Sequence, residues 1–242
     1  MAAIIDMVTS FGWDRNRPTD WGLDTLLGVL ERHGVERAYT HSWRAVHYAG
    51  PEGNDETLAA CAEHEVLAPV GVLDPRRFFD CREEARRRCR QGFRVFRFFP
   101  EVQGWSVESL AFRKICETLA ELGASIIIPA GGSGQPSRIA ERLADLDLRV
   151  LLIGGSYGSL GEILAVLEEF PRAYADGHVM DSPYAIEALL EFGGDHRALF
   201  GSDSPARSFE APLLMAQHAE ITEDQRRRYL RDNALAFVGE GA

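Results

Sequence analysis

The chain has little of what marks several protein classes. Its 242 residues include four cysteines, and none of them is part of a C-x-x-C pair, which argues against a zinc site or a disulfide framework. No apolar run approaches the roughly 18 residues that a membrane-spanning helix needs. The first residues carry no basic region ahead of their short apolar run, so a signal peptide is not expected. These absences predict a soluble, cytoplasmic protein.

Positive charge is also scarce, because 37 acidic residues against 26 basic ones give a formal net charge of −11. Nucleic acid and anionic membrane surfaces are therefore not expected as partners. The glycine-rich stretches at 131–134 and 154–158 match neither G-x-G-x-x-G nor a Walker pattern, so tight turns are favoured over phosphate-binding loops. The partner class that remains is a small molecule.

What is present is a regular alternation of short apolar runs with helix-like segments. The apolar runs predict strands at 2–7, 35–40, 66–73, 93–99, 124–128, 148–153, 173–177 and 198–202. Polar loops are expected at 8–18 and 41–54, with a helix over 55–65 after the second loop. About 250 residues is the usual size of a (β/α)8 barrel, and eight strand–helix units favour a closed barrel over an open sheet. We predict one α/β domain over residues 1–242, with the TIM-barrel fold.

The last apolar run ends in Gly-Ser-Asp, so Asp203 is expected at the carboxyl end of the eighth strand, where such barrels place their active sites. Ser204 and Pro205 are expected to begin a helix as its N-cap and first residue. His41 follows the second strand and His178 the seventh, so both are expected beside Asp203. Either histidine, oriented by Asp203, can serve as a general base near neutral pH.

Arg97 is the second candidate at this end of the barrel. Strand alternation places it on the face opposite Phe96 and Phe98. A guanidinium inside a barrel is costly unless it meets an anion. Arg97 is therefore either a clamp for a substrate carboxylate or phosphate, or half of an internal pair with Asp203 or Asp176, and the sequence favours neither.

Three further side chains are candidates for substrate binding. Trp13 and Trp105 lie in expected strand-to-helix loops, where they can cover a planar ligand together with Trp43 and Tyr48. His47 shares the long loop that follows the second strand. Aromatic packing between loops is the alternative explanation for all of them. A homodimer is a further possibility, for which Leu213, Leu214 and Met215 are expected to supply exposed apolar surface.

Several of these stretches resemble the amidohydrolase-related (amidohydrolase 2) branch of the metal-dependent TIM-barrel hydrolases. The matching stretches are Ile5-Asp6, Phe11-Gly12, the segment 92–100 with Gly104-Trp105, the segment 195–205 and Asn233-Ala234. The resemblance covers nearly the whole chain, and the segment at 195–205 is its most specific part. It implies hydrolysis or decarboxylation of a small carbonyl or carboxylate substrate.

The chain departs from this family at its metal ligands. Metal-bearing members open with Asp-x-His-x-His, in which two imidazoles on one side of a strand hold an ion. Here Val8 and Ser10 stand at those positions, while Pro129 and Gly154 stand where histidines are expected after the fifth and sixth strands. Asp203 remains, and one carboxylate does not make a zinc site. We therefore predict a degenerate site with no metal cofactor. A zinc site relocated to His41, His178 and Asp203 is the weaker alternative.

Two functions remain open on the sequence alone. The first is an enzyme in which Asp203, His41 or His178, and Arg97 act on a small carbonyl or carboxylate compound without the usual metal. The second is a pseudoenzyme that binds a small ligand or serves as a subunit of an assembly. The lost ligand positions favour the second, and the intact eighth-strand motif favours the first.

Overall fold

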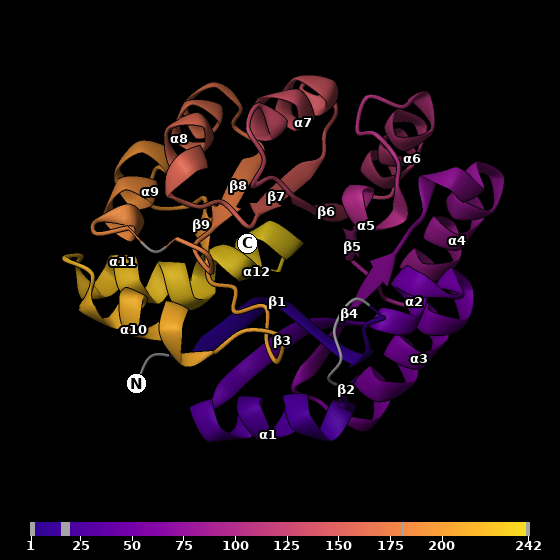
Figure 1. Ribbon diagram of the computed structural model, residues 1–242, viewed down its shortest axis with the longest axis horizontal. Coiled ribbons are helices and arrows are strands. Elements are labelled where there is room, and N and C mark those ends of the chain that lie inside the picture. Colours follow the sequence, from indigo (N-terminus) through magenta and orange to yellow (C-terminus); the bar gives the residue numbers. More distant parts are fainter. Residues whose placement is uncertain (1–2, 16–19, 181, 241–242) are drawn as a thin grey trace.

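Parallel strands alternate with helices along the chain and form a barrel. The computed structural model describes residues 3–15, 20–180 and 182–240. Within them, eight parallel strands surround a common axis and the helices lie outside (Figure 1). The strands are β1 (Ile4–Trp13), β3 (Val35–Ser42), β4 (Leu67–Val72), β5 (Val95–Arg97), β6 (Ser125–Pro129), β7 (Arg149–Ile153), β8 (Ala173–Asp176) and β9 (Ala198–Leu199), and a short β2 (Asp20–Trp21) pairs antiparallel with β1. The predicted TIM barrel is confirmed.

Helices follow the strands and cover the outside of the barrel. They are α1 (Leu23–His33), α2 (Trp43–His47), α3 (Gly50–Glu63), α4 (Phe78–Arg90), α5 (Pro100–Gln103), α6 (Leu110–Glu121), α7 (Gln135–Leu143), α8 (Leu160–Glu169), α9 (Ala185–Gly193), α10 (Glu210–His218), α11 (Glu223–Arg227) and α12 (Asn233–Val238). Thr222 and Gln225 form the reciprocal capping box that begins α11. Among the described residues, no helix combines the length and the apolar character needed to cross a membrane.

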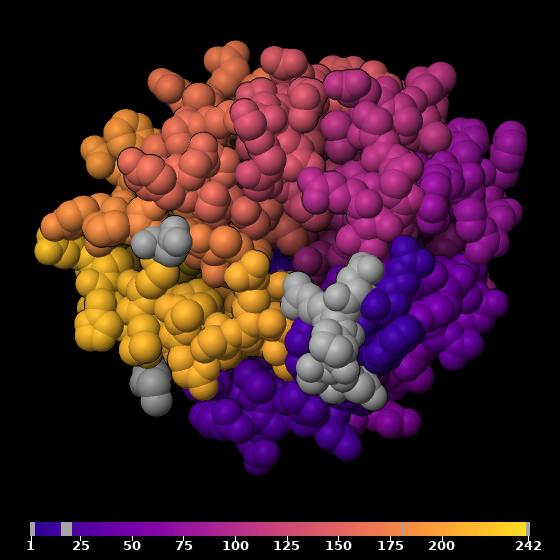
Figure 2. Space-filling model, in the orientation of Figure 1, coloured from indigo at the N-terminus to yellow at the C-terminus, as the bar shows by residue number. Residues whose placement is uncertain are grey.

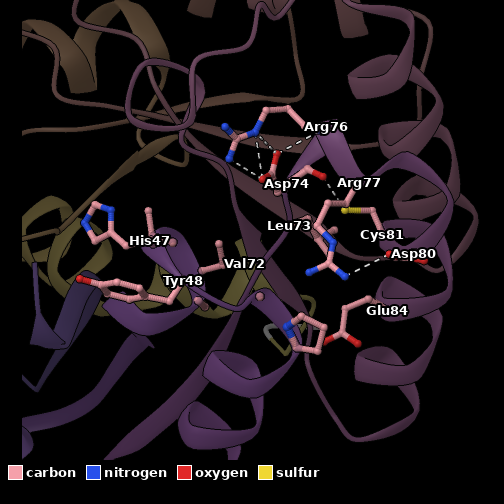
Figure 3. Close-up of a pocket in the computed structure, with 14 residues that line it drawn as sticks. His47, Tyr48, Val72, Leu73, Asp74, Arg76, Arg77, Asp80, Cys81 and Glu84 are labelled. Carbon is pink, nitrogen blue, oxygen red and sulfur yellow. Dashed lines mark hydrogen bonds and ion pairs between the residues drawn. The ribbon is translucent and has the colours of Figure 1, made fainter. Parts of the chain in front are cut away.

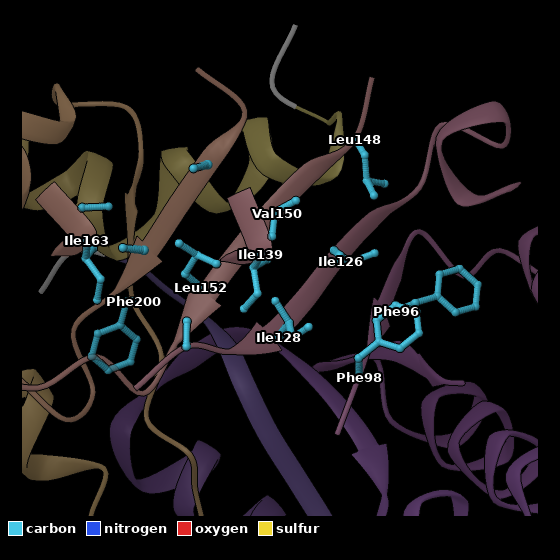
Figure 4. Close-up of a cluster of buried hydrophobic side chains, with 14 of the residues drawn as sticks. Phe96, Phe98, Ile126, Ile128, Ile139, Leu148, Val150, Leu152, Ile163 and Phe200 are labelled. Carbon is cyan, nitrogen blue, oxygen red and sulfur yellow. The ribbon is translucent and has the colours of Figure 1, made fainter. Parts of the chain in front are cut away.

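Strand alternation divides the apolar side chains into two layers. The outer layer packs between the strands and the helices, as Figure 4 shows for Phe96, Phe98, Ile126, Ile128, Val150 and Leu152. The inner layer fills the barrel itself and includes Ile5, Val70, Val95, Ile127, Leu151 and Leu199. At the amino ends of the strands, Phe237 and Val238 of α12 pack against this inner layer. With that end filled, polar side chains inside the barrel gather at the carboxyl ends of the strands, which form its mouth.

The barrel closes where β9 and the residues after it meet β1. The closing backbone hydrogen bonds run from Met7 N to Phe200 O (3.0 Å), from Asp203 N to Val8 O (2.8 Å) and from Ser10 N to Ser204 O (3.1 Å). The early and late parts of the chain accordingly lie side by side on the face shown in Figure 2. These bonds and the Thr9–Ser204 bridge join the two ends of the sheet into a nearly closed barrel.

A buried carboxylate lies on this seam. Asp6 Oδ1 accepts hydrogen bonds from the backbone N–H of Val8 (3.0 Å) and of Ser202 (3.1 Å), and Oδ2 is hydrogen-bonded to the Ser202 hydroxyl. Asp6 is fully buried. Burial raises the pKa of Asp6 to about 7, although these hydrogen bonds and the charge of His178 oppose the rise. The Asp6–Ser202 connection therefore fixes the two strands whose following residues build the mouth.

Two expectations about the ends of these strands were wrong. The segment from Val8 to Trp13 is strand and not loop, because β1 keeps its pairing with β3 as far as Phe11 opposite Ser42. Ser204 and Pro205 do not begin a helix. Ser204 is buried and forms a parallel bridge with Thr9, and the next helix, α10, starts at Glu210. In both places backbone pairing with a neighbouring strand, β3 in the first case and Thr9 of β1 in the second, decides the local conformation, and the N-cap and turn residue types do not.

Two smaller expectations also needed correction. The segment 41–54 is not a continuous polar loop, because it contains α2 and the start of α3. The Ser42 hydroxyl caps α2 by accepting a hydrogen bond from the Arg44 N–H (3.1 Å). In α10, Leu213 is buried and Leu214 is half exposed, so the apolar surface expected there is smaller than predicted.

The pKa of Asp6 gives a test of the closure. A carboxyl group whose pKa is higher in the folded state favours folding most at low pH, and that contribution is lost as the pH rises through the folded-state pKa. Relative to Asp6→Asn, the wild-type free energy of unfolding should fall by roughly 2–4 kcal/mol between about pH 4 and pH 7. Urea denaturation of the wild type and Asp6→Asn across this pH range measures the difference between their free energies of unfolding. Contributions from the other titrating groups cancel in that difference because both proteins contain them. If the free energies of unfolding of the two proteins changed in parallel with pH, the pKa of Asp6 in the folded state would not be raised.

Candidate functional site

Arg97 lies inside the mouth, on the opposite face of β5 from Phe96 and Phe98. Its side chain is only 7% exposed, and its Nη2 lies 3.7 Å from Asp203 Oδ1. The guanidinium carbon stands 4.9 Å from the centre of the Phe99 ring, within cation–π range. Among the described residues, Nε of Arg97 has no hydrogen-bond partner. A buried, permanently charged group with a free donor is available to an anionic ligand.

Asp203 meets Arg97 at the carboxyl end of β9. Its backbone has φ +56°, in the left-handed region that aspartate tolerates better than most residues, while its N–H still bonds to Val8 O across the seam. The other carboxylate oxygen, Oδ2, lies 3.6 Å from Nε of the exposed Arg207. The Asp203 side chain is 13% exposed, so it lies at the border between the barrel interior and solvent.

A second acid, Asp176, orients His178 just after β8. The Nδ1–H of His178 donates to Asp176 Oδ2, and the Gly154 N–H donates to Asp176 Oδ1 at 3.1 Å. Burial lowers the pKa of His178, but the charge and hydrogen bond of Asp176, with the charge of Asp203, outweigh it. The net result is a pKa above the ordinary value for histidine. His178 can therefore hold a proton near neutral pH and release it from Nε2, the ring nitrogen that is not bonded to Asp176.

His41 has the opposite character. It is fully buried between Trp43 and Phe99, whose ring centres lie 5.5 and 5.2 Å from its own. Within the described part of the chain, neither ring nitrogen makes a hydrogen bond of normal geometry. Burial, reinforced by the charge of Arg97, lowers the pKa of His41 well below its usual value. His41 is thus a neutral imidazole beside Arg97, suited to hydrogen bonding and not to holding a proton.

The other predicted residues lie further out. His47 is hydrogen-bonded through Nε2 to Asp14 Oδ1 (2.7 Å) and stacks on Trp43. Trp13 stacks on the exposed Tyr48 at the rim. Trp105 packs against Phe98 and Phe112 in the outer layer. The structure therefore brings Arg97, Asp203, His178 and His41 together, and places Trp105 on the opposite side of β5 from Arg97.

A small hollow opens on the rim between α2, α3 and the start of α4 (Figure 3). His47 and Tyr48 line one side of it, and the ion pairs Asp74–Arg76 and Arg77–Asp80 line the other. Neither Arg97 nor Asp203 lines this hollow. The hollow is therefore separate from the residues that gather at the mouth.

The sequence reasoning missed the pairing of Asp176 with His178. Asp176 was considered there only as a possible partner of Arg97. The two residues are two positions apart at a strand end, and this spacing places side chains on the same side. That spacing was the available signal, and an orienting acid next to a histidine is a common feature of proton-transfer sites.

The residues in the mouth do not fit the family's metal site. Val8 and Ser10 are buried on β1, and Ser10 Oγ accepts a hydrogen bond from Trp43 Nε1 (3.0 Å). Pro129 and Gly154 have no side-chain donor. Across residues 3–15, 20–180 and 182–240, no three His, Cys, Asp or Glu side chains are grouped so as to hold an ion.

Comparisons with known proteins agree with this fold. A family model described as amidohydrolase matches residues 16–239, and none of the curated proteins matches the sequence. The chain is similar to 2,6-dihydroxybenzoate decarboxylase from Rhizobium, at 14% identity and a TM-score of 0.78 over 98% of this chain and 99% of that one. It is also similar to an uncharacterised TIM-barrel protein from Bordetella bronchiseptica, at 17% identity and a TM-score of 0.80 over 99% of both chains.

A third similar structure is that of 5-carboxyvanillate decarboxylase from Novosphingobium aromaticivorans, complexed with manganese and 4-hydroxy-3-methoxy-5-nitrobenzoic acid. It is 12% identical, with a TM-score of 0.75 over 98% of this chain and 96% of that one. At these identities the structural similarity establishes a shared fold.

The Asp176–His178 pair predicts a change that NMR can detect. In Asp176→Asn, His178 stays buried but loses its negative partner, so its pKa should fall from above the ordinary value of about 6.5 to below it. Titration of the imidazole C–H resonances, assigned with His178→Gln, measures the shift. Asp14→Asn is the matched control, because it removes the partner of His47 and should leave the His178 titration unchanged. An unchanged pKa in Asp176→Asn would rule out the proposed orientation of His178.

Proposed function

Because the chain belongs to the amidohydrolase family, we propose that it binds a small carboxylate in the barrel mouth and releases the carboxyl group as carbon dioxide. The observation that carries this proposal is the buried Arg97 guanidinium, which keeps a free Nε–H beside a neutral imidazole and a protonatable one. The decarboxylases among the similar structures support the same class of chemistry.

Binding follows from the donors of Arg97 and His41. The Nη2 of Arg97 faces Asp203 at 3.7 Å, while its Nε–H has no partner among the described residues and is available to a substrate carboxylate. Charge-assisted bonds from a guanidinium to a carboxylate are among the strongest polar contacts in proteins. A neutral His41 supplies one further N–H without adding positive charge. The single charge of Arg97 therefore suits a ligand with one negative charge.

His178 supplies the proton that the reaction needs. When the bond between the substrate carbon and its carboxyl group breaks, the electron pair stays on that carbon and carbon dioxide leaves. The carbon then takes a proton from the His178 imidazolium, which Asp176 orients and stabilises, and water returns a proton to His178 afterwards. General acid catalysis of this kind contributes about 10²–10⁴-fold to a rate. Asp203 holds Arg97 in place and keeps the charge of the mouth balanced.

A second function is a barrel that binds such an anion without turning it over. It is supported by the loss of side-chain donors at Val8, Pro129 and Gly154, and by the near burial of Arg97. Both functions require Arg97 to bind the ligand. They differ in whether His178 moves a proton, so carboxylate binding and turnover are tested separately.

Carboxylate binding is tested on Arg97. A panel of small aromatic and aliphatic carboxylates, each paired with its neutral amide, should raise the melting temperature of the wild type for acids only. A bound acid at 100 times its dissociation constant stabilises by about 2.7 kcal/mol. Arg97→Met should lose this response and Arg97→Lys should weaken it, whereas Arg207→Met, which removes the exposed neighbour of Asp203, should retain it. A response to acids that persists in a folded Arg97→Met variant would rule out the clamp.

Turnover is tested on acids that bind. In D₂O the product should carry one deuterium at the carbon that lost carbon dioxide, and His178→Gln should lower kcat by about 10²–10⁴-fold with a smaller effect on binding. The wild-type rate should decline as the pH rises through the pKa of His178, because the imidazolium is the proton donor. Binding without any release of carbon dioxide across the panel would instead favour the non-catalytic barrel.

A further inference from the structure

The positions that carry metal ligands in the family are filled here by groups that serve other contacts. A Cβ added at Gly201 would lie 2.7 Å from Val8 Cγ2 and 3.0 Å from Asp176 Oδ2, so an apolar side chain stands close to the acids of the mouth. Ser10 binds Trp43, and Gly154 contributes its backbone N–H to Asp176. These replacements remove ligands, and they also leave Asp203 and Asp176 without a metal counter-charge.

We infer that the guanidinium of Arg97 supplies the fixed positive charge that a divalent ion supplies in metal-bearing members of the family, and that it excludes divalent cations from the mouth. The inference rests on the proposed function in that both place Arg97 at the reaction centre. Beyond that function, Arg97 in place of a metal ion balances the charge of the acids at the mouth, and carboxylate binding alone does not test this.

The charges around Arg97 support this role. Asp203 forms an ion pair with it at 3.7 Å, and Asp176 and Asp6 are near enough to stabilise its charged form. A guanidinium keeps its charge at every physiological pH. Because Arg97 is nearly buried and Asp203 is only 13% exposed, solvent and salt screen the charges between them less than they do at the surface. A divalent ion bound to Asp203 would lie within a few ångströms of the guanidinium and would be repelled by it.

The same geometry predicts what happens when Arg97 is removed. Asp203, Asp176 and His178 would then lose their positive neighbour, and the space of the arginine side chain would open between them. Two carboxylates and an imidazole are a ligand set that suits zinc and cobalt. The barrel mouth should therefore gain affinity for metal through the loss of one arginine, although the histidine ligands on β1 are still missing.

The experiment is a titration of the purified full chain with Co²⁺, followed by visible absorption and by metal analysis after gel filtration. The wild type should bind no stoichiometric cobalt and should keep its melting temperature in EDTA. Arg97→Ala should bind one equivalent at least about 100-fold more tightly than the wild type, with a d–d spectrum that reports the ligand geometry. Adding Asp203→Asn to Arg97→Ala should remove this gain.

Arg207→Ala is the matched control, because it removes a cation from the exposed side of Asp203 and should gain no affinity. Arg97→Met, which keeps most of the side-chain volume, replaces Arg97→Ala if that variant does not fold. A stoichiometric metal ion in the purified wild type would overturn the inference. So would a folded Arg97→Ala or Arg97→Met variant whose affinity for cobalt equals that of the wild type. A wild type that binds neither metal nor carboxylate would overturn the proposed function and leave this inference standing.

Discussion

The structure depends on the hydrogen bonds that Asp6 makes across the seam of the barrel. Eight strands can surround one axis only if the last pairs with the first, and β9 is only two residues long. Asp6 compensates by accepting the N–H groups of Val8 and Ser202 and by bonding to the Ser202 hydroxyl. An unpaired N–H buried at this position would cost about 1–3 kcal/mol. Because Asp203 follows Ser202 directly, the contact that closes the fold also places the acid of the mouth.

Charge balance is the second constraint, and it follows from burial. Asp176 and Asp6 are buried and Asp203 is only 13% exposed, and unpaired carboxylates in such surroundings would be unfavourable. Arg97 neutralises part of this charge, and His178 takes a proton from solution because its pKa is raised. Asp6 is partly protonated near neutral pH because its pKa is about 7. His41 stays neutral because burial, reinforced by the charge of Arg97, lowers its pKa. Asp6, His178 and His41 thus differ in their affinity for a proton within one small volume, and a proton-transfer reaction needs such differences.

The sequence predicted the architecture and the position of Arg97 well. The apolar runs located all eight strands, and alternation along Phe96-Arg97-Phe98 correctly placed the arginine inside the barrel. Prediction failed where contacts distant in sequence override local preference. The segment 8–18 looks like a loop because it is rich in Gly, Asp, Asn and Arg, but pairing of β1 with β3 holds its first residues as strand. Ser204 looks like an N-cap, but the bridge to Thr9 holds it in the seam.

The sequence by itself determined which chemical groups this barrel has: one inward arginine, an aspartate at the last strand, and no paired histidines on the first. These depend on residue identity and on the two-residue period of a strand, both of which can be read locally. Only the tertiary structure decided which of these groups meet. Asp176 orients His178, Asp203 faces Arg97, and Trp105 turns away into the outer layer, because the barrel's curvature and closure set those distances. The sequence therefore specifies which side chains are present, and the closed fold decides which of them lie next to one another.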